Sequence, residues 1–146
     1  MLDLFSLAIH PTICSMFVKQ FLTWIGLKEA LHNNQHAAPH VSEGEIWWES
    51  IGENIGSEIN GKSDLFSRPA IIYKKLAHGF YFIIPTTSLQ KNGSWYVGFK
   101  QNGKLMTACL HQARAIDHRR ISSKLGTLDD SDFQAVKAGF KILYAS

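Results

Sequence analysis

The sequence is poor in cysteine, with Cys14 and Cys109 as its only two. Two thiols so far apart along the chain are too few for a disulfide scaffold, and no Cys-x-x-Cys pair suggests a zinc site. The seven histidines never adopt metal-ligand spacing with carboxylates or thiols. We therefore predict a protein of the reducing cytoplasm that binds no metal and needs no cofactor.

The sequence also lacks a long hydrophobic run and a strong excess of charge of one sign. Its apolar opening from Leu2 to Val18 is broken by His10-Pro11, follows no Lys or Arg, and is shorter than the roughly 20 residues that span a bilayer. Fifteen Lys and Arg against twelve Asp and Glu leave a net charge of +3, which permits a polyanionic partner without requiring one. We expect a soluble chain with no membrane contact, and its 146 residues suit one domain better than two.

The first part of the chain predicts a helical extension. Between Met16 and His32, apolar residues recur at the three- and four-residue spacing of one helix face: Phe17, Phe21, Trp24, Ile25 and Leu31. The polar stretch after this segment ends at Pro39, which cannot continue a helix. We therefore place an N-terminal helical extension at residues 1–42, ahead of a unit at residues 43–146.

Residues 1–15 differ from the rest of that extension. Pro11 stands in an apolar mixture with no helical or strand period, so the segment should add little buried area. We interpret Met16 as a candidate authentic first residue and residues 1–15 as non-native or disordered.

Short β-prone runs separated by turn residues follow Gly44. They are Glu45–Ile51, Pro69–Lys75, Phe80–Thr87, Ser94–Lys100 and Leu105–Leu110. Pairs such as Asn102-Gly103 supply residues that tolerate positive φ in tight hairpins. Beyond the strands, Asp129 or Asp130 can cap a helix that carries its apolar residues on one face: Phe133, Val136, Phe140 and Leu143. The pattern predicts an α+β, mainly β fold, a small barrel closed on one side by the C-terminal helix.

Arg68 and Thr87 stand where predicted strands meet loops. Arg68 follows the longest break in the β pattern, Gly52 to Ser67, so it places a cation at the rim of the barrel. Thr87 ends a strand, where its hydroxyl can leave the core and face a ligand. Taken alone, such an arginine is more often a salt-bridge residue and such a threonine more often satisfies local backbone.

Six segments of the second unit form an ordered set of motifs. They are Glu43–Trp48, Ile55–Lys62, Ser67–Ile72, Ile83–Ser88, Gln112–Asp117 and Lys124–Leu128. These motifs resemble those of the MazF/PemK toxins, and the likeness covers residues 43 to 146. The helix at Trp24–His32 resembles an extension found in one branch of that family.

The resemblance implies an SH3-like barrel that forms a homodimer and is inhibited by a small antitoxin. It implies cleavage of single-stranded RNA, without a metal, to leave a 2′,3′-cyclic phosphate and a 5′-hydroxyl. The arginine of the family's Arg-Pro motif falls on Arg68, as phosphate clamp and proton-transfer group, and the threonine of its Pro-x-Thr-Ser motif falls on Thr87. Glu58, in the Gly-x-Glu loop, matches a position that acts on the ribose or on protons in some members. The implied RNA-binding residues are Lys62, Ser88, Gln112 and Arg114.

Two features depart from the family pattern. His111 stands where the family more often has Ser or Asp, and Ser63–Ser67 lengthens the loop before Arg68. Neither feature removes a catalytic group, but both bear on which bases the groove accepts.

Several other residues have two interpretations. One of the pair Trp47 and Trp48 must face inward on a strand, so stacking on RNA bases competes with a place in the core, and we assign neither to the site. The basic run from Arg114 to Arg120 is either a phosphate-binding stripe or a solvated face, and Asp117 within it favours a local turn or ion pair. Cys109 is interpreted as a buried strand thiol without an activating partner.

Two other functions remain compatible with the predicted fold. SH3-like toxins of the CcdB type bind DNA gyrase and cleave nothing, and a noncatalytic RNA-binding barrel is the second alternative. The pair Arg68 and Thr87 in their motifs favours the nuclease, since neither alternative requires them.

Overall fold

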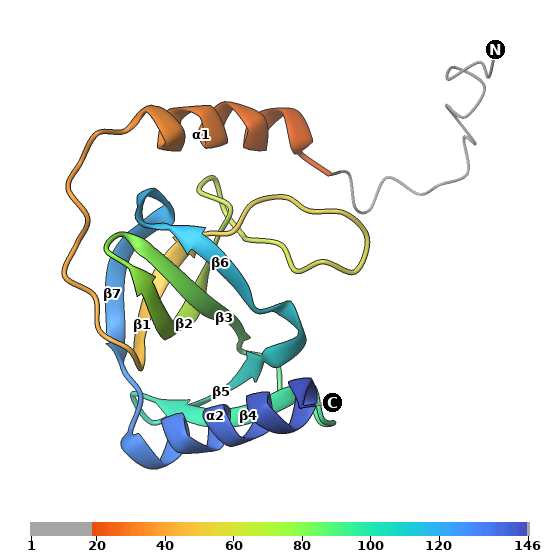
Figure 1. Cartoon of the computed structure of the whole chain (residues 1–146). Helices are drawn as coiled ribbons and strands as arrows, with labels where there is room; N and C mark the ends of the chain where they lie inside the picture. The colour runs from red at the N-terminus through yellow and green to blue at the C-terminus, as the bar shows by residue number, and fades with distance from the viewer. Residues whose placement is uncertain (1–18, 146) are drawn as a thin grey trace, which may run out of the picture.

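The computed structural model describes residues 19–145. Its elements are α1 (Phe21–Asn33), β1 (Glu45–Ser50), β2 (Ser67–Ala77), β3 (Phe80–Thr87), β4 (Tyr96–Gln101), β5 (Lys104–Cys109), η2 (Leu110–Gln112), β6 (Arg114–Asp117), η3 (His118–Arg120), β7 (Ile121–Thr127) and α2 (Asp130–Tyr144). The strands curl into a barrel-like sheet with α1 across one end and α2 at the other, as Figure 1 shows. The interpretation of residues 1–15 lies outside the described residues. Between residues 19 and 145, no helix is long and apolar enough to cross a membrane.

All strand pairs are antiparallel, and the main path of the sheet is β4-β5-β3-β2-β1-β7. β3 has two neighbours along one edge, because Phe80 to Ile83 pair with β6 whereas Thr86 and Thr87 pair with β5. The sheet stays open, since β4 and β7 do not pair with each other in the described part of the chain. The predicted class is confirmed: mainly β, a small barrel-like sheet, a C-terminal helix and an N-terminal helix.

Seven strands are present where the sequence pattern predicted five. The five predicted strands are confirmed, with ends within two residues of the predicted ones. β6 and β7 come from the basic run and the segment after it, and each buries a single residue, Ile116 and Ile121 respectively. Such strands lack the apolar alternation that identifies a strand in a sequence. They form because β3 and β1 offer edges with which to pair.

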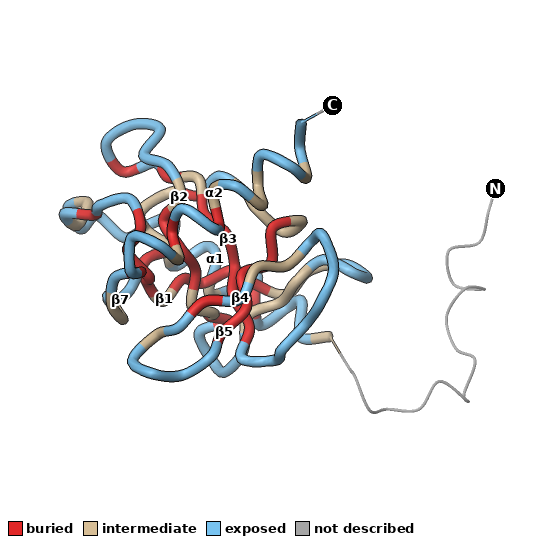
Figure 2. Tube along the Cα trace, turned by 90° about the horizontal axis from the view of Figure 1, so that it is seen from below, coloured by how far each residue is buried: buried red, intermediate tan, exposed pale blue. Residues whose placement is uncertain are grey.

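Two clusters of buried side chains stabilise the sheet. Residues alternate between faces along a strand, so Ile71 joins the cluster beneath α2 that contains Phe133 and Val136, whereas Ile72 joins the second cluster. Trp47 belongs to the second cluster and is 8% exposed, which confirms that one of the two adjacent tryptophans is a core residue. Figure 2 shows the buried residues concentrated in the strands.

α2 begins where the sequence predicted. Asp129 occupies the N-cap position, although its carboxylate makes no capping hydrogen bond. Phe133 and Val136 are buried, and Phe140 and Leu143 pack against the same cluster, which confirms the predicted apolar face. α2 therefore covers one side of the sheet and leaves the opposite end to α1.

The prediction for α1 was wrong in its extent. The helix begins at Phe21 rather than near Met16, and among the members of the predicted apolar stripe that the structure describes only Trp24 is buried, Phe17 lying outside the described residues. Phe21 and Ile25 are exposed, and Leu31 is partly exposed. The stripe does not form because α1 lies against a loop and η3 rather than against a sheet face, so one large side chain makes the contact.

Two local predictions are confirmed. Asn102-Gly103 form the turn between β4 and β5 with φ values of 50° and 75°, as a type I′ hairpin requires. Asp117 accepts hydrogen bonds from the backbone N–H of Arg119 and from its Nε at 2.7 Å. The hydrogen bond from the Arg119 side chain lowers the pKa of Asp117 to about 2.

Candidate functional site

The start of β2 and the end of β3 lie side by side and bring Arg68 and Thr87 together. The two strands are antiparallel with Ala70 opposite Pro85, so residues that precede Ala70 reach residues that follow Pro85. Arg68 accordingly donates from Nη1 to the carbonyl oxygen of Thr86 at 3.1 Å. The hairpin between the strands thus joins two residues that are well separated in the sequence.

The Arg68 guanidinium is held by carbonyl groups and forms no ion pair with a carboxylate among residues 19–145. Its Nε donates to the carbonyl oxygen of Asn60 at 2.8 Å, in addition to the bond from Nη1 to Thr86. Burial lowers the pKa of Arg68, yet a guanidinium stays protonated at any working pH. A partly buried cation held only by neutral oxygens keeps its full charge available to an anion.

The two threonines at the end of β3 make different contacts. Thr86 is fully buried and donates from Oγ1 to the carbonyl oxygen of Pro69 at 2.8 Å. The Oγ1 of Thr87 accepts from the backbone N–H of Leu89 at 3.2 Å, which leaves its own proton available to a ligand. Thr87 therefore adds a hydroxyl donor beside the charge of Arg68.

Two pockets flank Arg68 and Thr87, and both residues line each of them. The larger pocket, of about 530 Å³, is also lined by Lys62 and Ser88. The smaller pocket, of about 250 Å³, is also lined by Gln112. Five of the seven residues predicted for the site thus surround two adjoining cavities that share one wall.

Glu58 and Arg114, the other two predicted residues, line neither pocket. Glu58 is exposed on the loop between β1 and β2. Arg114 donates from Nε to the carbonyl oxygen of Gln112 at 3.3 Å and from Nη2 to its side-chain oxygen at 3.5 Å. Burial lowers the pKa of Arg114 and Arg120 lowers it further, whereas Glu58 and Glu49 raise it. Arg114 therefore supports Gln112 in this structure rather than facing a cavity.

Gln112 fastens the long loop to the barrel. Its Oε1 accepts from the backbone N–H of Ile59 at 3.0 Å, and its Nε2 donates to the carbonyl oxygen of Ser57 at 3.1 Å. Ser57 and Ile59 line the smaller pocket. The amide of Gln112 thus holds the loop segment around Glu58 at the rim of that pocket.

Trp48 joins the site, although sequence reasoning left it out. It is partly buried, lies opposite Pro69 in the sheet register, and lines the larger pocket with it. The signal was available, because Trp47 fills the core and strand alternation turns its neighbour to the other face. Trp48 therefore presents an aromatic surface next to the Arg68 cation.

His111 also joins the site, in the smaller pocket. Its ring stacks on Trp95, with ring centroids 4.7 Å apart and an interplanar angle of 22°. Burial lowers the pKa of His111, a hydrogen bond to the backbone of Trp95 offsets part of this change, and the nearby charge of Lys91 lowers the pKa slightly further. The imidazole is therefore neutral near pH 7, which permits one ring nitrogen to accept a proton.

Cys109 ends β5 and is buried, which confirms its interpretation as a strand thiol. Burial raises the pKa of the thiol, and Arg68 offsets only part of that rise. Within the described residues 19–145, no three His, Cys, Asp or Glu side chains gather as a metal-binding group.

A family model described as the PemK-like, MazF-like toxin of type II toxin-antitoxin systems matches residues 42–144. The matched segment begins just before β1 and ends with α2, so it contains every residue that lines the two pockets. α1 precedes it. No curated protein sequence matches the chain.

Several solved structures share the fold. MazF of Deinococcus radiodurans is 21% identical, with a TM-score of 0.62 over 74% of this chain and 100% of that chain. A MazE-MazF complex of the same organism is 18% identical, with a TM-score of 0.56 over 73% of this chain and 98% of that chain. An endoribonuclease from Mycobacterial species, in complex with its cognate antitoxin, is 8% identical, with a TM-score of 0.56 over 70% and 93%.

Glu49 is an unusual charge-bearing residue behind the site. It is fully buried in β1, and neither carboxylate oxygen has a hydrogen-bond partner among residues 19–145. Burial raises the pKa of Glu49 well above its usual value, and the charges of Arg120 and Arg114 offset only part of the rise. Glu49 therefore keeps its proton to a higher pH in the folded chain than in the unfolded one.

We predict that Glu49→Gln changes how stability depends on pH. A carboxyl with a raised folded pKa loses its contribution to stability as pH rises above the unfolded pKa of about 4.3. Glutamine has no such transition, so the melting temperatures of the two proteins should be similar near pH 4 and diverge in favour of the variant toward pH 8. A difference in melting temperature that does not change with pH, or one that shifts in favour of wild type as pH rises, would contradict a raised pKa for Glu49.

Proposed function

The chain belongs to the family of PemK-like, MazF-like toxins of type II toxin-antitoxin systems, and from this membership we propose that it is an endoribonuclease that cleaves single-stranded RNA without a metal. The cytoplasmic pool of mRNA is its proposed substrate. One observation carries the proposal. The guanidinium of Arg68 has no carboxylate partner in the described chain, and Arg68 and Thr87 together line both of two adjoining pockets.

Metal-free cleavage requires a fixed positive charge, because the attack on phosphorus builds negative charge on the nonbridging oxygens. Asn60 and Thr86 accept hydrogen bonds from Nε and Nη1 of Arg68, whereas Nη2 has no hydrogen-bond partner among residues 19–145. Nη2 and the second N–H of Nη1 can therefore donate to phosphate oxygens. Because two carbonyl oxygens already orient the guanidinium, its charge does not have to move when the reaction occurs.

In the proposed reaction, the ribose 2′-oxygen attacks phosphorus in line and the bond from phosphorus to the 5′-oxygen breaks. The products are a 2′,3′-cyclic phosphate and a 5′-hydroxyl, so one proton leaves the 2′-hydroxyl and one reaches the leaving oxygen. Arg68 binds the nonbridging oxygens and, as a protonated guanidinium, donates toward the leaving 5′-oxygen, and Thr87 donates its hydroxyl to the same phosphate. Glu58, on the adjoining loop, is proposed to position the ribose or to accept the proton of the 2′-hydroxyl.

The two pockets suit the nucleotides on either side of the cleaved phosphate. In the larger pocket, Trp48 offers a stacking surface of the kind that contributes ~1–3 kcal/mol per base. Lys62 and Ser88 line the same pocket and are proposed to bind backbone phosphates. In the smaller pocket, Gln112 supplies an amide, and Arg114 is proposed to act through it.

We predict that Arg68→Ala and Thr87→Val both lower kcat on single-stranded RNA while leaving the melting temperature near that of wild type. Loss of one charge donor at a reacting oxyanion typically costs ~2.7–4 kcal/mol, which corresponds to roughly 10²–10³-fold in kcat. Thr87→Val keeps the side-chain volume and removes one uncharged donor to the phosphate, together with the acceptor of the Leu89 N–H, so its effect on kcat should be smaller, about tenfold or more. Fragment formation from a long RNA in EDTA measures both variants.

The matched control is Lys141→Ala, which removes one exposed positive charge from α2, away from both pockets. It should cleave as wild type does. A folded Arg68→Ala protein that cuts at the wild-type rate would refute the mechanism. Wild type that yields no discrete fragments in EDTA would instead favour a gyrase-binding toxin or a noncatalytic RNA-binding barrel.

We also propose that the chain forms a homodimer through the segment Gln112 to Asp117. β6 supports this proposal, because within the described part of the chain it pairs with β3 alone and therefore presents an open strand edge. Light scattering at micromolar concentration should give twice the mass of one chain, and Ala115→Glu on the exposed face of β6 should lower it. A fully active monomer would contradict the proposal.

We propose, finally, that a cognate antitoxin occupies the same groove. The solved MazE-MazF and endoribonuclease-antitoxin complexes concern related folds, and here Arg68, Lys62 and Lys104 line a pocket that also has apolar walls. An acidic or amphipathic peptide would complement that lining. The product of the neighbouring upstream gene should inhibit cleavage, bind Arg68→Ala more weakly, and compete with uncleavable RNA. Simultaneous binding of both would be evidence against this arrangement.

A further inference from the structure

α1 lies outside the segment that matches the family model, yet its largest buried side chain contacts the loop that holds Arg68. Trp24 is 6% exposed, and its ring lies 5.7 Å from the ring of Phe66, centroid to centroid. It also lies against Gly52, which has a φ of 103°, and a Cβ added there would come within 2.5 Å of the indole. Trp24 thus packs on both ends of the loop that runs from Gly52 to Phe66.

The two ends of this loop are joined by backbone hydrogen bonds directly beneath the indole. The Gly52 N–H donates to the carbonyl oxygen of Phe66 at 3.0 Å, and the Gly61 N–H donates to that of Gly52 at 2.8 Å. Lys62 and Ser67 exchange two further bonds of 2.8 and 2.9 Å. Any shift of Gly52 is therefore passed to Gly61, the residue next to Asn60.

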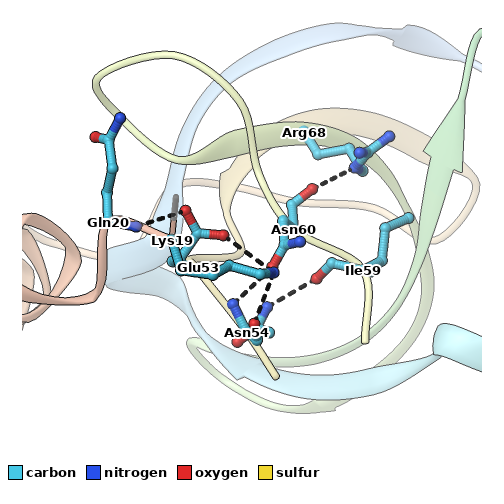
Figure 3. Close-up of polar contacts among 7 residues, drawn as sticks. All are labelled: Lys19, Gln20, Glu53, Asn54, Ile59, Asn60 and Arg68. Carbon is cyan, nitrogen blue, oxygen red and sulfur yellow. Dashed lines mark hydrogen bonds and ion pairs between the residues drawn. The ribbon is translucent and has the colours of Figure 1, made fainter. Parts of the chain in front are cut away.

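A second set of contacts runs from the start of α1 along the loop, as Figure 3 shows. Lys19 donates from Nζ to the carbonyl oxygen of Asn54 at 2.9 Å and lies 3.4 Å from a carboxylate oxygen of Glu53. The Gln20 N–H donates to the other carboxylate oxygen of Glu53 at 3.2 Å. The residues that precede α1 are therefore bonded to two consecutive residues of the loop.

Asn54 connects the start of α1 to Asn60, the residue whose carbonyl oxygen accepts a hydrogen bond from Arg68. Its backbone N–H donates to Oδ1 of Asn60 at 2.6 Å, and its Nδ2 donates to the carbonyl oxygen of Ile59 at 2.7 Å. The carbonyl oxygen of Asn60 in turn accepts from Nε of Arg68 at 2.8 Å. Figure 3 shows these residues lying between the start of α1 and the guanidinium.

We propose that α1 is a positioning element for Arg68, with Trp24 and Asn54 as positioning residues that set the Asn60 carbonyl and thereby the direction of the guanidinium fork. The loop buries little of its own surface, since Ile55 and Leu65 are exposed. The loop is therefore held in place by contacts with other elements, among them α1 and the two residues before it. The catalytic consequence rests on the proposed ribonuclease function, whereas the effect on the Arg68 Nε hydrogen bond does not.

The fork must lie within a fraction of an ångström of its productive place, because a 1 Å misplacement of a reacting group can cost roughly 100-fold in rate. A positioning element acts on the transition state more than on substrate binding, so its loss lowers kcat more than it raises KM. A helix that only stabilises the fold would instead leave kcat unchanged below the melting temperature.

The test uses the full-length chain and three variants of α1. Trp24→Ala removes the contact with Gly52 and Phe66, Trp24→Phe keeps an aromatic ring there, and Leu22→Ala alters a residue of the same helix that is 86% exposed. On a fluorogenic single-stranded RNA, well below each melting temperature, we expect Trp24→Ala to lower kcat at least tenfold with KM changed less than threefold. Trp24→Phe should recover most of kcat, and Leu22→Ala should match wild type. Wild-type kcat for folded Trp24→Ala would overturn the proposal.

A second measurement separates this inference from the ribonuclease proposal. Nuclear magnetic resonance reports the solvent exchange of the Arg68 Nε proton, which is protected while Asn60 accepts it. Exchange should be faster in Trp24→Ala and in Asn60→Ala, since the latter removes the side-chain oxygen that accepts from the Asn54 N–H and leaves the Trp24 packing intact if the former fails to fold. Unchanged exchange in folded Asn60→Ala would contradict the role of the Asn54 contact. If wild type cleaves no RNA but exchange accelerates as expected, the ribonuclease proposal fails and the positioning role of α1 stands.

Discussion

The partly buried guanidinium of Arg68, held by two carbonyl oxygens and paired with no carboxylate in the described chain, is the constraint on which the site depends. A carboxylate partner would neutralise the charge that a phosphate is to meet, so the structure uses neutral acceptors to direct the fork. One acceptor, Thr86, comes from the end of β3 and the other, Asn60, from the long loop. The acceptor on β3 is fixed by the sheet, whereas the position of the acceptor on the loop depends on the contacts that hold the loop in place.

That division explains why so many contacts converge on a surface loop. Gln112 ties the loop to the barrel through Ser57 and Ile59, and Arg114 in turn supports Gln112. From the opposite side, Trp24 of α1 covers the loop's two ends. The family-matched segment and the helix that precedes it thus act on the same carbonyl group, that of Asn60.

The sequence predicted the β pattern of the barrel and the residues at the junction of its two pockets, but not what each polar residue touches. Arg68 and Thr87 follow from motifs that stand at strand ends, and strand ends are set by local patterns. Gln112 and Arg114 were expected to face RNA, whereas in this structure they bond to the loop and to each other. The contacts of Gln112 with the loop join residues more than 50 positions apart, and no local pattern encodes them.

Contacts with distant parts of the chain also determine β6, β7 and the exposure of α1, which the sequence pattern did not predict correctly. β6 and β7 were not predicted because each buries one residue and depends on a neighbouring strand for its hydrogen bonds. The stripe on α1 was overestimated because periodicity shows which residues share a face and not whether anything covers it. The place of Trp48 in the site could have been predicted from the sequence, since one member of an adjacent pair on a strand must face away from the core.

The most direct test of the account is a crystal structure of the wild-type chain bound to single-stranded RNA that carries a 2′-O-methyl group at the cleaved nucleotide. We expect nonbridging oxygens of that phosphate within hydrogen-bond distance of Arg68 Nη2 and Thr87 Oγ1, with one flanking base against Trp48 and the other in the pocket of His111. RNA bound on another face, with Arg68 still bonded only to Asn60 and Thr86, would contradict it.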